Sequence, residues 1–153
     1  MAPPNFASGM QFDVYVWLIG DKNVKIQTRI WRFIMAKAEL KHFSKPDEVR
    51  EFPKGKLELV TIAGATIGRA VFQPGWKWST SVKPIAKTES CEAPHFQYQI
   101  SGTLHVKLDD GAEFESKAGD IVNLPSGHDG WVVGNEPVEV VDFQGMVDYA
   151  KPK

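Results

Sequence analysis

The chain has 153 residues, a formal net charge of -1 and a sequence pI of about 6.4. This length suits a single domain with a real core, because chains of this size bury about two-thirds of their surface on folding. The charge balance gives no electrostatic reason to expect nucleic acid or an anionic membrane as a partner, so the function is to be sought in a pocket for a small molecule.

The cysteine content and the apolar runs indicate a cytoplasmic protein. The single cysteine, Cys91, cannot form an internal disulfide, which fits a reducing compartment. The longest uninterrupted apolar run, residues 14–19, is far shorter than the ~20 residues that span a bilayer. The N-terminus also lacks the basic start and the small-residue cleavage site of a signal peptide.

Residues 1–34 are expected to form an N-terminal extension, either a hairpin or a disordered segment. Residues 12–19 and 24–30 alternate loosely around a Gly-Asp-Lys-Asn turn. Met35 begins a polar stretch that reads like the ordinary start of a cytosolic protein. Residues 35–153 are therefore expected to form the single domain.

The first part of this domain is predicted to contain one helical turn and then two strands. Residues 44–52 carry Pro46 and two acidic residues in a first turn, and Pro53 follows as a stop. Residues 57–62 and 66–72 read as strands around an Ala-Gly-Ala turn, so the barrel is expected to begin at residue 57. Two tryptophans, Trp76 and Trp78, share a face by alternation and are expected to cover one end of the barrel. A polar loop is expected at residues 82–90.

Residues 94–131 read as an unbroken series of short strands. In the first of these, strict alternation separates a polar face from an apolar face, and alternation alone predicts that the apolar face is buried. The polar face carries His95, Gln97 and Gln99, and the apolar face carries Phe96, Tyr98 and Ile100. Further strands are predicted at residues 104–108, 113–116, 121–124 and 138–143, with an Asp-Gly hairpin turn at residues 110–111. The tail at residues 148–153 is predicted to be too polar to pack.

Two motifs in this stretch resemble the signature of the cupin superfamily. Gly119, five residues, Pro125, one residue and Gly127 are similar to its second half, and residues 98–102 resemble the Tyr-Val-Leu-x-Gly end of its first half. The resemblance covers roughly residues 57–147. It implies an all-β fold, a cupin-like jelly-roll β-barrel with a metal or ligand inside, here with the short helical turn before the barrel and the N-terminal extension.

The resemblance also implies a reshuffled set of metal ligands. Carried over position by position, the His, His and Glu of the first half fall on Glu89, Cys91 and His95. The third His would fall on Gly130, but His128 lies two residues earlier and so on the same face of an extended strand. Imidazole and thiolate suit borderline and soft ions, so the expected cofactor is a divalent transition metal: Zn, Fe, Mn, Ni or Cu.

Each candidate ligand also has a structural interpretation. His95 could cap a polar strand face in water, and His128 could be a solvated turn residue. Cys91 could be a small buried hydrophobe, and Glu89 a solvated loop carboxylate. The candidates for the lining of a ligand pocket are Gln97, Gln99, Trp76 and Trp131. The other histidines, His42 and His105, are expected to lie outside the site.

Three classes of function are compatible with these residues, and the fold alone cannot choose between them. We predict a small-molecule-binding cupin domain that holds a divalent metal, with catalysis left open. One alternative is a metal-dependent oxygenase, isomerase or lyase acting on a small organic acid or sugar derivative. Another is a module that binds a non-metal ligand, or a protein partner through Trp17 and Trp31. The resemblance further implies a homodimer that pairs through the apolar outer face of Phe96, Tyr98 and Ile100.

Overall fold

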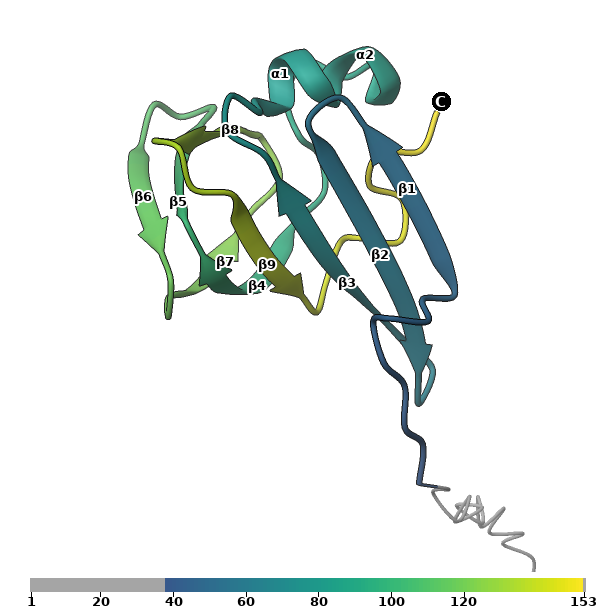
Figure 1. Cartoon of the computed structure of the whole chain (residues 1–153). Helices are drawn as coiled ribbons and strands as arrows, with labels where there is room; N and C mark the ends of the chain where they lie inside the picture. The colour runs from purple at the N-terminus through teal and green to yellow at the C-terminus, as the bar shows by residue number, and fades with distance from the viewer. Residues whose placement is uncertain (1–37, 153) are drawn as a thin grey trace, which may run out of the picture. The chain divides into compact units, whose positions relative to one another are not determined.

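The computed structural model describes residues 38–152, so the predictions for residues 1–34, with Trp17 and Trp31, lie outside the described part of the chain. The regular secondary structure of the described part is almost entirely strand (Figure 1). In chain order the elements are β1 (Glu48–Phe52), β2 (Gly55–Ile62), β3 (Ala65–Phe72), α1 (Trp78–Ser81), α2 (Lys83–Ala86), β4 (His95–Ser101), β5 (Thr103–Leu108), β6 (Glu113–Lys117), β7 (Ile121–Leu124), β8 (His128–Val133) and β9 (Val138–Asp142).

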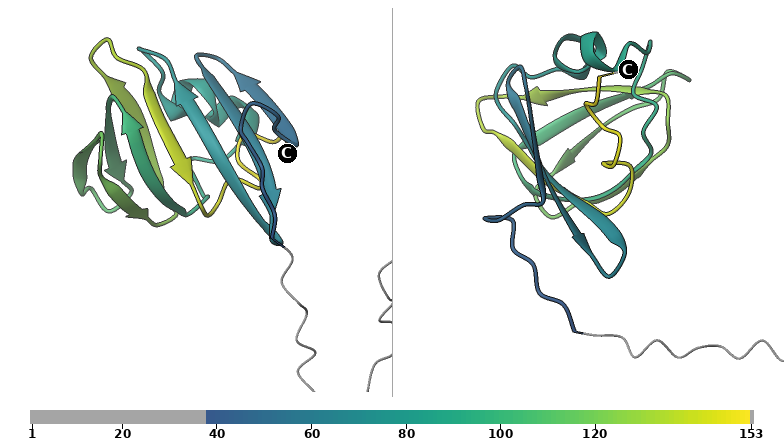
Figure 2. Two further views of the ribbon diagram at one scale, coloured as in Figure 1. Left: turned by 60° about the horizontal axis from the view of Figure 1, so that its bottom comes forward. Right: turned by 90° about the vertical axis from the view of Figure 1, so that its right-hand side faces the viewer.

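The strands form two antiparallel sheets that curl into a barrel (Figure 2). One sheet has the order β1-β2-β3-β9-β4-β7, and the other has the order β6-β5-β8. Strands β4 and β9 are neighbours although 36 residues separate Ser101 from Pro137, whose carbonyl accepts a hydrogen bond from the Ser101 hydroxyl. This pairing across the chain places the start of β4 beside the end of β9.

The interior is filled by apolar side chains from both sheets. Leu57, Ala70, Val138 and Val140 of the larger sheet are fully buried, and Val106 of the smaller sheet packs among them. Burying a valine or leucine side chain contributes about 1.5–3 kcal/mol relative to leaving it exposed. The interior of the barrel is therefore a packed core over most of its length.

The helical turn predicted at residues 44–52 is wrong, because Glu48–Phe52 is strand β1. It pairs with β2 in the register Glu48↔Leu59 and alternates between exposed Val49 and buried Arg50. Pairing along a neighbouring strand overrides the weak capping signals of Pro46 and the acidic residues that follow it. The sheet thus begins nine residues before the Leu57 start that the sequence predicts.

Two short helices lie after β3, and the second, α2, falls in the polar loop predicted at residues 82–90. Trp78 begins α1 and is buried, and α2 has a proline in its first turn and ends at Lys87 in the left-handed conformation, with φ 55. A four-residue helix gains little from its own hydrogen bonds, so the burial of Trp78 and Val82 accounts for its position. Within residues 38–152, no helix is long and apolar enough to cross a membrane.

The predicted hairpins and turns of residues 94–131 are confirmed. Gly111 in the Asp-Gly turn between β5 and β6 has φ 93. The signature glycine Gly102 has φ 70, and a Cβ there would lie 2.7 Å from the carbonyl oxygen of Pro137. Gly102 is therefore needed both for the turn from β4 to β5 and for the close approach of the chain before β9.

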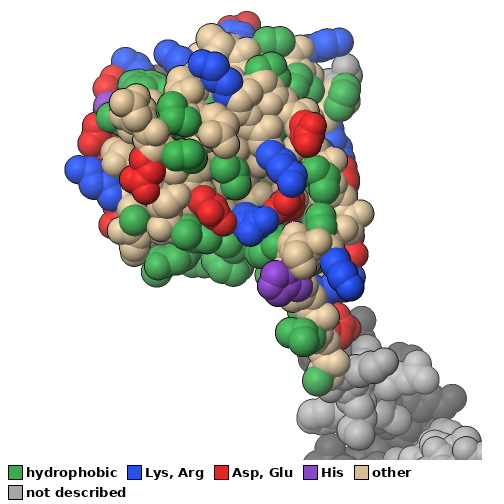
Figure 3. Space-filling view, in the orientation of Figure 1, with side chains coloured by type: hydrophobic (Ala, Val, Ile, Leu, Met, Phe, Trp, Pro, Cys, Tyr) green, Lys and Arg blue, Asp and Glu red, His purple; other side chains and the backbone are tan. Residues whose placement is uncertain are grey.

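Strand β4 turns its polar face inward. His95, Gln97 and Gln99 are buried, whereas the side chains of Phe96, Tyr98 and Ile100 are 42–45% exposed. The burial expected from alternation alone is wrong, whereas the outer position of this apolar face, which the resemblance implies, is confirmed. With Ile121 and Phe143 it forms part of the exposed apolar surface, and Figure 3 shows hydrophobic side chains gathered along the lower edge of the barrel. Pairing of two copies through this face stays a prediction.

The C-terminal segment packs against the barrel, so the prediction of a free polar tail is wrong for its described residues. Tyr149 and Ala150 are buried. The guanidinium of Arg50 donates hydrogen bonds to the carbonyl oxygens of Met146, Val147 and Tyr149, at 3.1, 2.8 and 2.5 Å. A charged donor that satisfies three carbonyls fixes the path of this segment over one end of the barrel.

Candidate metal site

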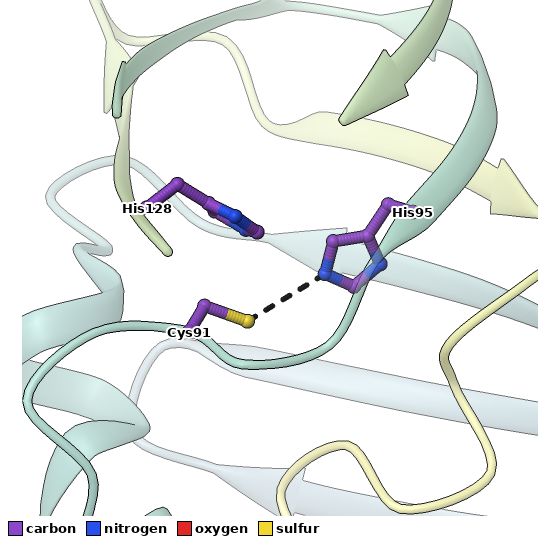
Figure 4. Close-up of side chains that lie close together, drawn as sticks. All are labelled: Cys91, His95 and His128. Atoms are coloured by element: carbon purple, nitrogen blue, oxygen red, sulfur yellow. Dashed lines mark hydrogen bonds between the residues drawn. The ribbon is translucent and has the colours of Figure 1, made fainter. Parts of the chain in front are cut away.

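Three buried side chains from separate parts of the chain meet inside one end of the barrel (Figure 4). Cys91 lies in the loop before β4, His95 begins β4 in the larger sheet, and His128 begins β8 in the smaller sheet. Their potential ligand atoms all lie within 4.8 Å of one another. The sequence therefore predicted three residues that the fold brings together.

Backbone hydrogen bonds hold Cys91 beside His128. The Cys91 N–H donates to the carbonyl of His128 at 2.8 Å, and the Gly127 N–H donates to the carbonyl of Cys91 at 2.7 Å. Together they form an isolated antiparallel bridge that extends the edge of the smaller sheet. The position of the thiol is thus set by the sheet rather than by a free loop.

The two imidazoles are oriented so that each leaves its Nε2 atom free of backbone partners. His95 Nδ1 lies 2.5 Å from a carboxylate oxygen of Asp142, which is fully buried, and His128 Nδ1 lies 2.8 Å from the carbonyl oxygen of Pro125. Both partners are acceptors, so each Nδ1 carries the proton and donates. The lone pair of each imidazole then resides on Nε2, as in metal-binding histidines with a fixed outer partner.

The distance between donor atoms suits a metal ion of ordinary size. Cys91 Sγ lies 3.6 Å from His95 Nε2, and the centroids of the two imidazole rings are 5.3 Å apart. For a tetrahedral zinc ion about 2.3 Å from sulfur and about 2.0–2.1 Å from nitrogen, the sulfur and nitrogen atoms lie about 3.6 Å apart. The same distance also allows a weak hydrogen bond between the thiol and the imidazole.

Burial controls the protonation of two of the three groups. It raises the pKa of the Cys91 thiol to about 12, and it lowers the pKa of His128 to about 4, with a smaller electrostatic contribution from His95. His128 is therefore neutral at physiological pH, which is the form that binds metals. A thiol in this environment ionises only if a cation compensates the charge.

A small cavity of about 30 Å³ adjoins the cluster. Since one water needs about 10–15 Å³ by this measure, the cavity has room for about two water-sized groups. Its lining includes His95 and His128 and also the polar side chains of Trp76, Trp78 and Gln97. The remaining lining residues are mostly apolar: Phe72, Leu104, Val106, Leu124, Gly130, Met146 and Tyr149.

Three N–H donors of this lining have no hydrogen-bond partner among the described residues. They are the indole N–H groups of Trp76 and Trp78 and the side-chain amide of Gln97. A buried donor without a partner costs about 1–3 kcal/mol, so three of them are expensive against a typical stability of about 5–15 kcal/mol. Such groups are rare in native structures, and their concentration at one cavity indicates that hydrogen-bond acceptors, from water or from a ligand, occupy it.

The structure does not bring Glu89 to the cluster. The side chain of Glu89 is 97% exposed and forms an ion pair with Lys83 at 2.7 Å, and this pair lowers the pKa of the carboxyl group. The stretch that contains it folds into α2 and the turn after it, which carries Glu89 to the outside. The interpretation as a solvated loop carboxylate is the one that the structure supports.

Two of the four predicted pocket residues lie elsewhere. Trp131 is on the outer side of β8, where it stacks on His105 with ring centroids 4.2 Å apart and lies under the Lys77 ammonium at 4.8 Å. Gln99 is fully buried, but its side chain is hydrogen-bonded throughout to Ser116 and to neighbouring carbonyls. Trp76 and Gln97 do line the cavity.

The remaining histidines lie outside the site, as the sequence predicts. His105 is on the outer face of the smaller sheet, between Trp131 and the carboxylates of Glu113 and Glu115. His42 hydrogen-bonds Ser44 before the first strand. Within residues 38–152, the only cluster of three potential metal ligands is therefore the one formed by Cys91, His95 and His128.

Three residues at the site were not found from the sequence. Asp142 orients His95, and the ring of Tyr149 lies edge-on to His95 at 5.6 Å between centroids. Gly145 allows the segment after β9 to pass close to the backbone that precedes His95. Gly145 has φ 89, and a Cβ there would lie 1.9 Å from the carbonyl oxygen of Pro94. The local sequence carries one signal: Gly145 follows the last predicted strand closely, as a turn residue would.

A larger groove lies on the other side of Cys91 and Tyr149. It has a volume of about 570 Å³ and runs between the loop that contains Cys91 and the C-terminal segment Val147 to Pro152. Trp78 and Tyr149 border both the groove and the small cavity. These two aromatic side chains therefore lie between the small cavity and the groove, and Cys91 itself lines the groove.

Neither a protein-family model nor a curated protein sequence matches the chain. Among solved structures, an RmlC-like cupin from Shewanella frigidimarina NCIMB 400 is similar with a TM-score of 0.51 and 16% identity, over 73% of this chain and 95% of that one. A protein of unknown function from Rhizobium leguminosarum bv. viciae 3841 has a TM-score of 0.50 and 20% identity, over 71% of this chain and 98% of that one. At these identities the similarity concerns the fold, and the predicted jelly-roll β-barrel is confirmed.

Proposed function

We propose that this chain, a cupin by its fold, holds a divalent transition-metal ion between Cys91, His95 and His128 and uses it to bind a small molecule. The observation that carries the proposal is the meeting of three buried donor atoms within 4.8 Å, contributed by two sheets and a loop. A carboxylate and a carbonyl outside the cluster hold both imidazoles in the tautomer that ligates through Nε2.

The donor set favours some ions over others. One thiolate and two imidazoles suit Zn, Cu, Fe and Ni, whereas Mn is better matched by oxygen ligands. The exposed, Lys83-paired position of Glu89 removes the one candidate oxygen ligand that the sequence offered. We therefore rank Zn, Fe, Cu and Ni above Mn.

Three protein ligands leave one position of a tetrahedral ion open. Structural zinc sites are closed by four protein ligands, whereas catalytic sites combine three with a water or substrate. This count supports a metal-dependent enzyme as a second candidate function. When bound, such an ion would act as a Lewis acid and lower the pKa of a bound water.

The protein contributes orientation and a dry environment. Asp142 and the Pro125 carbonyl orient the two imidazoles, and Tyr149, held by the Arg50 contacts to its segment, covers His95. The cavity of about 30 Å³ is too small for a sugar derivative, because pockets for such ligands are about 300–1,000 Å³. A larger substrate would have to approach from the groove beyond Trp78 and Tyr149.

The alternative is a metal-free core in which Cys91 donates a weak hydrogen bond to His95. Metal analysis of protein purified without added metal, followed by loading with zinc and gel filtration, distinguishes the two. We expect about one ion per chain for the wild type, and a loss of at least tenfold in affinity for Cys91→Ser, His95→Gln and His128→Gln.

Matched controls carry the same kinds of substitution outside the cluster. His105→Gln, His42→Gln and Glu89→Gln should each keep the wild-type metal content. Thermal unfolding in the presence of a chelator checks that each ligand variant still folds. A wild type that binds no zinc, or ligand variants that bind as tightly as the controls, would show that the cluster is only part of the core.

A further inference from the structure

Three of the residues that line the cavity beside the cluster carry buried side-chain donors that lack acceptors. The indole N–H groups of Trp76 and Trp78 and the amide N–H₂ of Gln97 have no partner among residues 38–152, and all three side chains line the cavity that His95 and His128 also line. Each of the three side chains is buried, with no more than 4% of its surface exposed. The three come from different elements: the turn after β3, the start of α1, and β4.

The donors point to the kind of ligand that the cavity accepts. Indole N–H groups can only donate, and tryptophan has no acceptor atom with which to bind a cationic or N–H-rich ligand. A ligand rich in acceptor atoms would satisfy all three groups at once. A divalent ion bound by one thiolate and two neutral imidazoles also keeps one positive charge, which an anion would neutralise.

The size of the cavity limits this ligand further. About 30 Å³ accommodates about two water-sized groups, and apolar side chains such as Leu104, Val106 and Leu124 close most of the remaining wall. A carboxylate on a long carbon chain would not fit without displacing Tyr149 or Trp78. The ligand class is thus a small monoanion of a few atoms, whose lone pairs can accept hydrogen bonds from the three donors.

We propose that the cavity is a small-anion site, in which Gln97, Trp76 and Trp78 donate hydrogen bonds to an anion that occupies the open position of the metal. The inference rests on the metal site proposed above. It adds the chemical class of the ligand, and it assigns Gln97 and the two tryptophans to binding of that ligand rather than to packing alone.

The experiment uses the full-length protein loaded with cobalt(II), whose absorption spectrum reports thiolate ligation and coordination number. Azide is added at constant ionic strength and pH, with fluoride as a second small anion and benzoate as one too large for the cavity. We expect azide and fluoride to change the visible spectrum in a saturable way, and benzoate to leave it unchanged.

Three variants remove one donor each: Gln97→Met, Trp76→Phe and Trp78→Phe. Each should bind cobalt in the wild-type amount and bind azide about tenfold more weakly, because a hydrogen bond to a charged group contributes about that factor. Trp131→Phe is the matched control, since it removes an indole N–H from the outer face of β8, and it should bind azide like the wild type.

The possible outcomes separate the two proposals. If the wild type binds cobalt but azide leaves its spectrum unchanged, or if the three variants bind azide as tightly as Trp131→Phe, the anion site is wrong and the metal site stands. If the wild type binds no cobalt, the metal site is wrong and the anion site falls with it. A tenfold loss confined to the cavity variants would establish the site.

Discussion

Two glutamines on β4, two residues apart and on the same inward face, define two different ends of the barrel interior. Gln99 is fully buried, its Nε2 donates to the carbonyls of Gly102 and Ser116 at 2.9 and 3.1 Å, and its Oε1 accepts a hydrogen bond from the Ser116 hydroxyl at 2.5 Å. Gln97 is also buried, but its Nε2 has no partner among the described residues. The first glutamine closes a structural network, and the second faces the cavity beside His95.

The difference shows that burial alone does not identify a functional polar residue. Both glutamines have the residue type, strand, face and burial that a pocket residue would have. What separates them is whether their hydrogen-bonding groups are satisfied within the protein, since native structures satisfy nearly all buried polar groups. Unsatisfied donors next to potential metal ligands are the better signal of a binding site.

The largest effect is expected from Gln99→Met. This change removes the acceptor of the Ser116 hydroxyl and the donor to two buried carbonyls, so it should lower the free energy of unfolding by about 3 kcal/mol. Urea denaturation of the metal-free protein measures this. A loss below about 1 kcal/mol would mean that the Gln99 network contributes little, and the contrast with Gln97 would disappear.

The second prediction concerns the pH dependence of stability that His128 causes. The pKa of His128 is about 4 in the folded protein, against 6.5 for an ordinary histidine, because burial disfavours the charged form. Between these values the unfolded chain binds more protons than the folded one, so stability falls as the pH falls. We expect a loss of up to about 3 kcal/mol in the metal-free protein from pH 6.5 to pH 4.

His128→Gln tests this assignment. It should remove most of that slope, whereas His105→Gln should retain it because His128 is still present. An equal slope in wild type and His128→Gln would show that other groups cause the acid sensitivity. Urea denaturation at a series of pH values gives the free energies that are compared.

A smaller and more local effect is expected from Arg50→Lys. Lysine cannot donate to the carbonyls of Met146, Val147 and Tyr149 together, so the C-terminal segment should open more often, by about 1–2 kcal/mol. Hydrogen exchange of amides in residues 146–150 measures this opening. Arg69→Lys is the matched control, because Arg69 pairs with Glu58 and donates to none of these three carbonyls. Equal exchange in the two variants would contradict the role of Arg50.

The smallest loss of stability is expected from Gln97→Met. Since the amide of Gln97 has no partner within the described residues, its removal breaks no hydrogen bond, and an apolar side chain of similar length should lower the free energy of unfolding by less than about 1 kcal/mol or raise it. Urea denaturation beside Gln99→Met gives a direct comparison. If Gln97→Met is as destabilising as Gln99→Met, the side chain of Gln97 contributes as much to stability as the hydrogen-bonded side chain of Gln99, and the comparison is wrong.

Local patterns explain how much of the fold could be predicted. The strands from His95 to Leu124 follow from period-two alternation and from Gly or Asp-Gly turns, which depend on neighbours in sequence. The sequence predicts a helical turn in place of strand β1 because the helix signals, Pro46 and the acidic residues after it, are local. The pairing of β1 with β2, which decides the conformation, cannot be read from those residues alone. The inward direction of the polar face of β4 also depends on the opposite sheet, so alternation did not reveal it and only the resemblance implied it.

The candidate site was predicted in part for the same reason. Motif spacing found Cys91, His95 and His128, since these lie at fixed distances from the signature glycines and proline. Asp142 was missed because it is 47 residues from His95 and reaches it only through the pairing of β9 with β4. Glu89 was included wrongly because spacing does not reveal that its stretch folds outward into α2.

The most direct test of the central claim is X-ray absorption spectroscopy at the zinc edge of the metal-loaded wild-type protein. The account predicts one sulfur at about 2.3 Å and two imidazole nitrogens at about 2.0–2.1 Å, together with one further light atom. The sulfur contribution should vanish in Cys91→Ser. A shell of oxygen or nitrogen atoms without sulfur in the wild type, or a protein that retains no zinc, would contradict it.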